Sequence, residues 1–304
     1  MCLWSVPEPI IFYLSDWRCK VENLTNYSLA AQTGSTLEHV IYIFLSLAVS
    51  VFALRRNALT LSAALGAFFL AVALYLAGGP LFFILLMVFF FSSTFLSHFK
   101  ASLKDPIEVR MHAKSGPRDL VQVGANGGAA LIMAIPFALS QNPAYLVAVA
   151  ASFAACNADT WASEIGILSK KAPVSLLTLK PVSPGLSGGV SPLGFLASLG
   201  GSAVVALTYG LYQLAAGNSG VLLLMQILMI TFGGLLGSVL DSFMGAAFQA
   251  KYISHETGEL TEKPVDNNKP NQLYSGLAFV NNDFVNFASS LLAASLVLLF
   301  VQLQ

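Results

Sequence analysis

Charged residues are scarce in this sequence: Asp, Glu, Lys and Arg make up 10% of its 304 residues, whereas 56% are hydrophobic. Soluble domains carry roughly 25% charged residues, so this chain has too few charges to cover a globular surface in water. Its formal net charge is zero, which offers no bulk attraction to nucleic acid. The composition therefore excludes a soluble globular protein and indicates an integral membrane protein.

Side chains that bind soft metals or form redox pairs are also few. The three cysteines, Cys2, Cys19 and Cys156, form no CxxC pair and no disulfide framework. Cys156 lies inside an apolar run, so we expect it to be a small packing residue. The four histidines are scattered, and no pair has the spacing of metal ligands. Any metal site must therefore use oxygen ligands.

Long apolar runs are what the chain has in abundance. Runs of roughly 18–28 residues predict transmembrane helices, because about 20 apolar residues cross the hydrocarbon core. The predicted helices cover 37–54, 59–77, 80–97, 121–140, 143–168, 192–216, 221–248 and 274–302. The sequence thus predicts an all-α fold, a polytopic transmembrane helical bundle of about eight spans. We expect a single membrane domain over residues 37–304, preceded by an N-terminal tail of uncertain structure over residues 1–36.

Basic residues alternate between the predicted loops. The loops after the first, third, fifth and seventh spans contain Lys or Arg, whereas the other loops and the C-terminus contain none. Because loops rich in Lys and Arg face the cytoplasm, we expect these four loops to be cytoplasmic and both termini to lie on the other side. The alternation also supports the count of eight, since a wrong count would break it.

Polar side chains inside the predicted spans gather toward the cytoplasmic end. Such groups are costly in lipid and by default indicate function. They are Asn126, Asn157, Asp159, Glu164, Asp241, Asn282 and Asn286. They could instead only hydrogen-bond neighbouring helices, but that role requires no common depth. We therefore predict a site at the cytoplasmic end of the bundle.

Helical spacing adds detail to this site. Two stripes repeat at intervals of four residues and so each share a helix face. The stripes are Arg118, Gln122 and Asn126, and Gly237, Asp241, Gly245 and Gln249. Glycines beside Asp241 let a ligand or another backbone approach closely. Asp159 and Glu164 differ by about 140° on an ideal helix, so both face one site only if their helix is broken.

A Gly/Ser-rich loop, "LKPVSPGLSGGVSPLG" (residues 179–194), follows the fifth predicted span. Glycine lets backbone N–H groups turn toward an anion, and the N-terminus of the next helix adds positive potential. The loop does not match the P-loop pattern, and a flexible turn is the competing interpretation. The proposed phosphate-binding residues are Arg118, Lys180, Gly185, Ser187, Gly188 and Gly189. Together with carboxylates that suit Mg²⁺, they predict phosphoryl transfer.

Five motifs, in order, resemble segments of the integral membrane family known as domain of unknown function 92. They are "RDLVQVGANGG" (118–128), "NADTWASEIG" (157–166), "PGLSGGVSPLG" (184–194), "GSVLDSFMGAAFQ" (237–249) and "SGLAFVNNDFVNF" (275–287). The resemblance covers residues 40–304, approximately. That family is similar to the phytyl-phosphate kinases of tocopherol synthesis in plants and cyanobacteria.

The resemblance implies an activity and a substrate class. An isoprenoid alcohol monophosphate is expected to be phosphorylated to the diphosphate by a nucleoside triphosphate, with CTP as the expected donor. We expect Asp159, Asp241 and Glu164 to be catalytic and to hold Mg²⁺. The expected substrate-binding residues are Asn126, Asn157, Asn282, Asn286 and Gln249. The expected partners are the lipid bilayer and an isoprenoid lipid phosphate, with no nucleic acid.

Two other functions fit some of the same features. Intramembrane carboxylates and glycine-interrupted helices also suit an ion-coupled transporter or lipid translocator. Against that function, the polar groups lie in one half of the bilayer rather than at its midplane, and no inverted repeat is visible. A membrane scaffold, with the polar stripes joining helices, is the third possibility and predicts no dependence on nucleotide or Mg²⁺.

Overall fold

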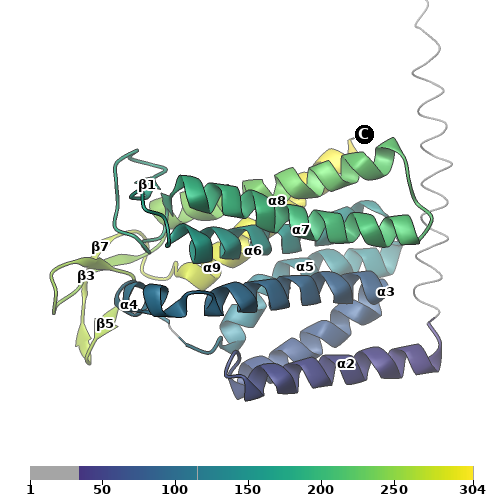
Figure 1. The fold of residues 1–304 in the computed structure, drawn as a ribbon, viewed down its shortest axis with the longest axis horizontal. Coiled ribbons are helices and arrows are strands. Elements are labelled where there is room, and N and C mark those ends of the chain that lie inside the picture. Colours follow the sequence, from purple (N-terminus) through teal and green to yellow (C-terminus); the bar gives the residue numbers. More distant parts are fainter. Residues whose placement is uncertain (1–33, 115, 304) are drawn as a thin grey trace, which may run out of the picture.

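The computed structural model describes residues 34–114 and 116–303, so nearly all of the predicted tail over residues 1–36 lies outside the described residues. The described chain forms a bundle of helices along one long axis (Figure 1). The helices are α2 (Thr36–Arg55), α3 (Leu61–His98), α4 (Ala101–Met111), α5 (Leu120–Ser140), α6 (Ala144–Gly166), α7 (Pro192–Ala215), α8 (Val221–Ala247) and α9 (Asn282–Gln302). The predicted all-α bundle is confirmed.

Six of these helices are long and apolar enough to cross a membrane: α2, α3, α5, α7, α8 and α9. The 38-residue α3 contains two predicted spans, because Gly79 has non-helical angles (φ 67°, ψ −156°) directly before Pro80. Both ends of α3 meet the same residue: Thr60 donates its N–H to the Arg118 carbonyl, and Ser97 accepts from the Arg118 guanidinium. The chain therefore reverses direction at Gly79.

The remaining predicted span is α6, which lies at the centre of the bundle. It packs against α3, α5, α7, α8 and α9, and its side chains from Leu146 to Ala158 are all buried. Many of these side chains are alanines, which let neighbouring helices approach closely in lipid. With α6 and the two halves of α3, the seven longest helices account for the eight predicted spans.

The start of the last predicted span is wrong. Residues 274–281 do not belong to the helix, because Asn281 caps α9 by accepting the Phe284 N–H. The apolar residues before this cap form a turn, in which the Val280 N–H donates to the Leu277 carbonyl, so the apolar run continues past the helix. An apolar run does not mark where a helix begins, and this caused the error.

Short strands lie at one end of the bundle, on the left in Figure 1. The strands are β1 (Val174–Ser175), β2 (Gly189–Val190), β3 (Lys251–Ile253), β4 (Leu260–Thr261), β5 (Val265–Asp266), β6 (Lys269–Pro270) and β7 (Gln272–Ser275). They form an antiparallel β1–β2 pair, a sheet of order β4-β3-β7, and a β5–β6 pair. We call residues 249–281, which carry β3 to β7, the cap segment.

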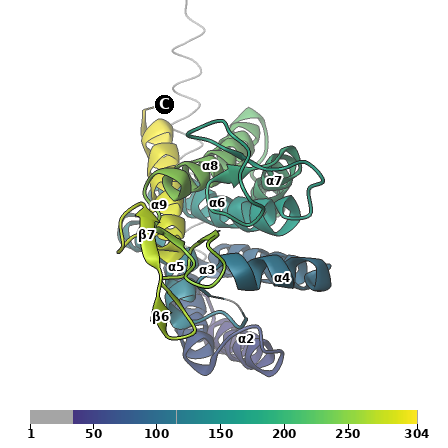
Figure 2. The ribbon, with the colours of Figure 1, turned by 90° about the vertical axis from the view of Figure 1, so that its left-hand side faces the viewer.

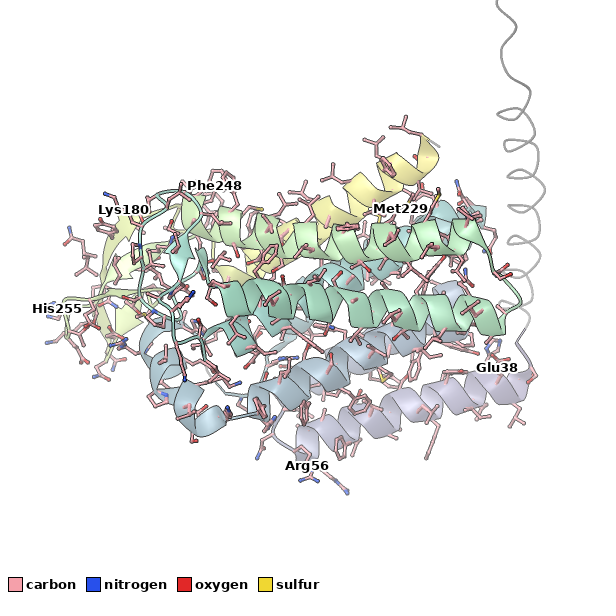
Figure 3. All side chains as sticks on the ribbon, turned by 45° about the horizontal axis from the view of Figure 1, so that its top comes forward. Glu38, Arg56, Lys180, Met229, Phe248 and His255 are labelled. Atoms are coloured by element: carbon pink, nitrogen blue, oxygen red, sulfur yellow. The ribbon has the colours of Figure 1, made fainter. Side chains whose placement is uncertain are left out.

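The four basic loops meet at one end of the bundle. Figure 3 shows Arg56, Lys180 and His255 at this end and Glu38 at the other. We call it the basic end. Figure 2, which looks at this end, shows α6 to α9 grouped together, α2 at the far edge of the bundle, and α4 projecting to one side. The alternation of basic loops therefore corresponds to a single face of the molecule.

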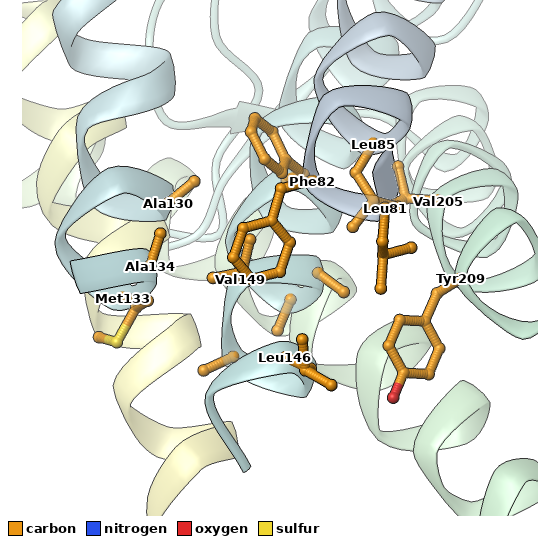
Figure 4. Packing of buried hydrophobic residues seen from close by; sticks show 14 of the residues in the cluster. Leu81, Phe82, Leu85, Ala130, Met133, Ala134, Leu146, Val149, Val205 and Tyr209 are labelled. Atoms are coloured by element: carbon orange, nitrogen blue, oxygen red, sulfur yellow. The ribbon is translucent and has the colours of Figure 1, made fainter. Parts of the chain in front are cut away.

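The apolar core fills the middle of the bundle. Figure 4 shows its packing, with Leu81, Phe82 and Leu85 of α3, Ala130, Met133 and Ala134 of α5, Leu146 and Val149 of α6, and Val205 and Tyr209 of α7. The hydroxyl of the fully buried Tyr209 donates to Gln226 and accepts from Gln213, so it carries no unmet hydrogen bond. This packed core fixes the helices that position the polar groups at the basic end.

Candidate functional site

A pair of carboxyl groups marks the candidate site. Asp159 of α6 and Asp241 of α8 lie within hydrogen-bonding distance of each other, and the Ser289 hydroxyl of α9 donates to Asp241 at 3.0 Å. Both aspartates lie ~10 Å inside the basic end of their helices. Two carboxyl groups this close need a proton or a cation between them. The structure thus brings together two of the three predicted metal-binding carboxylates.

Glycines on α8 place Asp241 against its neighbours. A Cβ on Gly237, one turn before Asp241, would lie 2.3 Å from the Cβ of Ala155 on α6. Only a glycine permits this contact between the two helices. The close approach of α6 and α8 brings Asp159 and Asp241 within reach of each other.

The Gly/Ser loop reaches the same face of α8. Gly188 has φ +85°, and a Cβ there would lie 2.5 Å from the Cβ of Ala246. A Cβ on Gly245, one turn after Asp241, would lie 3.3 Å from both the Gly188 nitrogen and the Ser187 Cβ. Residues 187 and 188 therefore pack on the last turn of α8, beside the carboxyl pair.

Two buried amide oxygens near the pair have no hydrogen-bond donor among the described residues: Gln249 Oε1 and Asn286 Oδ1. Gln249 is 2% exposed, and its Oε1 lies 3.5 Å from where a Cβ on Gly245 would be. Asn286 lies one turn before Ser289, the partner of Asp241. Two carboxylates with nearby carbonyl oxygens form a hard-oxygen donor set, which fits Mg²⁺.

The carboxyl pair is a small donor set. Among the described residues, no group of three or more His, Cys, Asp or Glu side chains is arranged to hold a metal. Mg²⁺ usually takes one or two protein carboxylates and completes its shell with water and substrate phosphates. The geometry fits a metal that arrives with a phosphorylated substrate better than a closed structural site.

Glu164 belongs to a different network. Helix α6 is unbroken from Ala144 to Gly166, so Glu164 points away from the face of Asp159. Its carboxylate accepts hydrogen bonds from the Lys104 ammonium and the Ser97 hydroxyl. Lys104 is 1% exposed and also donates to two carbonyls at the end of α3. The structure therefore does not bring Glu164 to the carboxyl pair.

Three other predicted site residues also lie away from the carboxyl pair. Asn157 is fully buried, accepts a hydrogen bond from Ser92 at 2.7 Å and donates to the Gly201 carbonyl at 2.8 Å. Its amide thus joins α6 to α3 and α7. Asn282 and Lys180 lie exposed at the basic end, Lys180 at the outside of its loop (Figure 3).

The predicted Arg118 stripe lines a cavity. Arg118, Gln122 and Asn126 form one side of a largely apolar cavity of about 60 Å³ between α2, α3 and α5, which is partly open to the outside. At its inner end, the Asn126 carbonyl accepts a hydrogen bond from the Cys156 thiol of α6 at 3.2 Å. Cys156 lies one turn before Asp159, so the stripe leads from the basic end toward the carboxyl pair.

Two buried charged residues of the cap segment were not predicted. Glu262 and Lys251 are each 7% exposed. Glu262 accepts the Ser187 N–H at 2.9 Å, and Lys251 donates to the Gly245 carbonyl at 2.9 Å. Burial lowers the pKa of Lys251, and the nearby Glu262 carboxylate opposes that shift. The strands that bury both residues are two to four residues long, too short for a periodic signal in the sequence.

Comparison with known proteins agrees with the motifs. The sequence model of the family described as "Integral membrane protein DUF92" matches residues 44–294. The chain belongs to this family. The matched region includes every helix that forms the carboxyl pair, the Gly/Ser loop and most of the cavity wall. The resemblance identified from five motifs is confirmed.

Relatives of the chain come from plants, archaea and cyanobacteria. "Protein PGR" of Arabidopsis thaliana is 30% identical over 283 residues, which cover 87% of this chain and 96% of that protein. An uncharacterized membrane protein of Methanocaldococcus jannaschii is 31% identical over 222 residues, covering 72% and 88%. Another, from Synechocystis, is 27% identical over 190 residues, covering 61% and 70%. No solved structure matches the chain.

Proposed function

We propose that the protein is a membrane-embedded, Mg²⁺-dependent phosphoryl transferase that acts on a lipid phosphate. One observation carries the proposal: the Asp159–Asp241 pair lies beside a glycine-rich loop at the basic end of a membrane bundle. By the distribution of Lys and Arg, we assign the basic end to the cytoplasm, where nucleoside triphosphates are available. Both ends of the described chain then lie on the opposite side.

Each group at the site has a role in this proposal. Asp159 and Asp241 hold Mg²⁺, with the Gln249 and Asn286 oxygens as nearby ligands, and Ser289 orients Asp241. When bound, Mg²⁺ neutralises charge on the reacting phosphates. Phosphoryl transfer depends mainly on such positioning and charge neutralisation.

The Gly/Ser loop supplies the phosphate-binding surface. Its residues Gly185, Ser187, Gly188 and Gly189 lie around the last turn of α8 and the end of α4. The Ser187 N–H already binds a carboxylate, that of Glu262, which supports an affinity of this loop for anions. Lys180 and Asn282 are exposed at the basic end and are available to incoming phosphates.

The reaction follows from the substrate class that the family resemblance implies. An oxygen of an isoprenyl monophosphate attacks the γ-phosphorus of a nucleoside triphosphate. A new P–O–P bond forms, and the bond to the nucleoside diphosphate breaks, so the diphosphate leaves with the electron pair. The attacking phosphate oxygen is ionised at neutral pH, so no dedicated general base is required.

A panel assay tests the proposal. Purified protein in nanodiscs is incubated with labelled CTP, ATP, GTP or UTP and with phytyl, geranylgeranyl or longer isoprenyl monophosphates, with and without Mg²⁺. We expect a labelled isoprenyl diphosphate that forms only with Mg²⁺, most of it from CTP. The absence of any diphosphate product across the whole panel would contradict the proposal.

Ion-coupled transport makes a different prediction in a second assay. Carboxyl groups inside membrane spans are also typical of ion-coupled transporters. Liposomes that contain the protein are therefore tested for uptake of labelled isoprenyl monophosphate without nucleotide. A transferase leaves uptake at the level of empty liposomes, whereas uptake driven by an ion gradient would support the transporter and contradict our proposal.

A further inference from the structure

Arg118 is a fixed cation with few partners. Its backbone N–H donates to the Ala58 carbonyl and its carbonyl accepts the Thr60 N–H, both at 3.0 Å. These two bonds hold the residue between α2 and α3 and fix where its side chain begins. Among the described residues, the guanidinium makes one hydrogen bond, to Ser97 at 3.5 Å, and no ion pair. A guanidinium has five N–H donors, so most of them remain free for a ligand.

The surroundings of Arg118 favour the binding of an anion. Burial lowers the pKa of the Arg118 guanidinium from its ordinary value, and the charge of Glu164 opposes that shift. Glu164, however, is already bound to Lys104 and Ser97. Arg118 is partly buried and makes no ion pair among the described residues, and such a guanidinium can bind a phosphate or carboxylate with two parallel hydrogen bonds.

The cavity beside Arg118 suits hydrocarbon. Its walls are lined mainly by apolar or small side chains. The polar exceptions are the Arg118 stripe along α5 and two serines of α2. One of them, Ser46, donates its hydroxyl to the Tyr42 carbonyl of its own helix, so it does not require a polar ligand. The cavity therefore has an apolar body and one charged edge.

Only one helix separates part of this cavity from lipid. Helix α2 packs mainly against α3, and Figure 2 shows it at the edge of the bundle. It turns large side chains such as Phe44 and Phe52 outward. Toward the bundle, its buried residues are Ser46, Ser50 and Ala53, all of them small. A lipid chain in the cavity would thus reach the bilayer past small side chains.

We infer that the cavity between α2, α3 and α5 binds the hydrocarbon chain of a single-chain lipid, whose phosphate head is held by Arg118 and Gln122. The identity of the head as a phosphate rests on the proposed function. The inner end of the cavity lies at Asn126, against Cys156 and one turn from Asp159. Ala67 lies on the cavity wall, so its size limits the width of the chain that the cavity accepts.

Photocrosslinking tests this site without requiring catalysis. A geranylgeranyl monophosphate with a diazirine in its chain is irradiated with the protein in nanodiscs, without nucleotide or Mg²⁺. We expect the label in peptides of α2, α3 and α5 that line the cavity. Ala67→Phe fills the cavity and should reduce labelling at least tenfold. A tenfold loss of affinity corresponds to about 1.4 kcal/mol. Leu65→Phe, at a 54% exposed position on the same helix, is the matched control and should label normally.

A second variant tests the charged edge. Arg118→Gln should weaken labelling by the monophosphate but leave labelling by the corresponding alcohol unchanged, and Arg118→Lys should restore part of the difference. Inorganic phosphate in excess should not compete, since the hydrocarbon chain contributes most of the binding. This comparison uses the alcohol as an internal check that the variant is folded.

Several outcomes would overturn the inference. They are labelling outside the cavity, equal labelling of Ala67→Phe and Leu65→Phe, an equal loss of labelling by the alcohol and by the monophosphate in Arg118→Gln, or competition by inorganic phosphate. Failure of the proposed function looks different. Labelling in the cavity without any transferase activity would contradict the function alone, whereas activity with labelling elsewhere would contradict this site alone.

Discussion

Asp159 and Glu164 lie five residues apart on one helix but serve two networks. The regular course of α6 turns Asp159 toward Asp241 and Glu164 toward Lys104. The angle between them could be computed from the sequence, but the partner of each could not. Lys104 belongs to α4, a short surface helix of mixed composition whose packing depends on contacts distant in sequence.

The buried pair of Lys104 and Glu164 gives a prediction for stability. Glu164→Gln leaves the ammonium of Lys104, 1% exposed, without its counter-charge. Removing one partner of a buried pair costs about 3–5 kcal/mol, so the variant should unfold at clearly lower temperature or denaturant concentration in detergent. The double variant Lys104→Met, Glu164→Met should recover most of the loss. A Glu164→Gln variant as stable as the wild type would show that the pair contributes little.

The sequence predicted how deep in the bundle the site lies better than it predicted which residues belong to the site. Asp159, Asp241, Asn286 and Gln249 were selected by sequence position. The structure places Asp159 beside Asp241, Asn286 one turn before Ser289, which binds Asp241, and Gln249 beside Gly245, one turn after Asp241. Asn157 was selected by the same rule but joins helices. The cost of a polar group in lipid does not depend on whether a ligand or a neighbouring helix satisfies it. That is why the sequence could not separate them.

At the scale of elements, the Gly/Ser loop is held in place by specific contacts and is not a free turn. Gly188 has a positive φ and touches the backbone of Ala246, and β2 at the end of the loop pairs with β1. These contacts fix residues 185–189 beside the last turn of α8. This position of the loop against α8 depends on the absence of a side chain at Gly188.

Gly188→Ala tests the contact between the Gly/Ser loop and α8. The added Cβ would lie 2.5 Å from Ala246, so the loop must move away from α8. We expect a higher KM for the nucleotide, with little change in the amount of folded protein. Gly116→Ala is the matched control, because Gly116 also has a positive φ, +91°, but has nothing within 4 Å. An equal effect of both variants would mean that backbone strain, and not the contact with α8, is responsible.

The cap segment shows the limit of pattern-based prediction for elements. Apart from the start of α9, the long helices were predicted within a few residues, because a span needs a long apolar run, whereas the strands of the cap pair over two to four residues. Their positions are fixed by contacts such as the Glu262 N–H to the Met111 carbonyl and the Thr261 hydroxyl to Arg110. Such contacts join residues about 150 positions apart and leave no local signal.

For the whole molecule, the single basic end predicts the orientation in the membrane. We expect Lys180→Cys, at an exposed position of the basic end, to react with a membrane-impermeant thiol reagent only from the cytoplasmic side. Ser219→Cys, in the exposed loop between α7 and α8 at the other end, should react only from outside. Both are made in a background without Cys2 and Cys19. Labelling of the two positions from the same side would contradict the topology.

The whole bundle places the Asp159–Asp241 pair, the Gly/Ser loop and the opening of the apolar cavity at the basic end. A lipid chain and a nucleotide can approach such a site from opposite directions, one from the bilayer and one from water. A scaffold would need none of this arrangement, and it predicts no dependence on nucleotide or Mg²⁺.

The most direct test of this account is phosphoryl transfer by Asp241→Asn. Transfer of label from γ-labelled CTP to geranylgeranyl monophosphate is measured with Mg²⁺ in the wild type, in Asp241→Asn and in Asp105→Asn, an exposed aspartate of α4 at the same end. We predict product from the wild type and Asp105→Asn, and a loss of at least about 100-fold in Asp241→Asn, the size expected for removing one electrostatic contact to the transition state. Equal transfer by all three proteins would contradict the account.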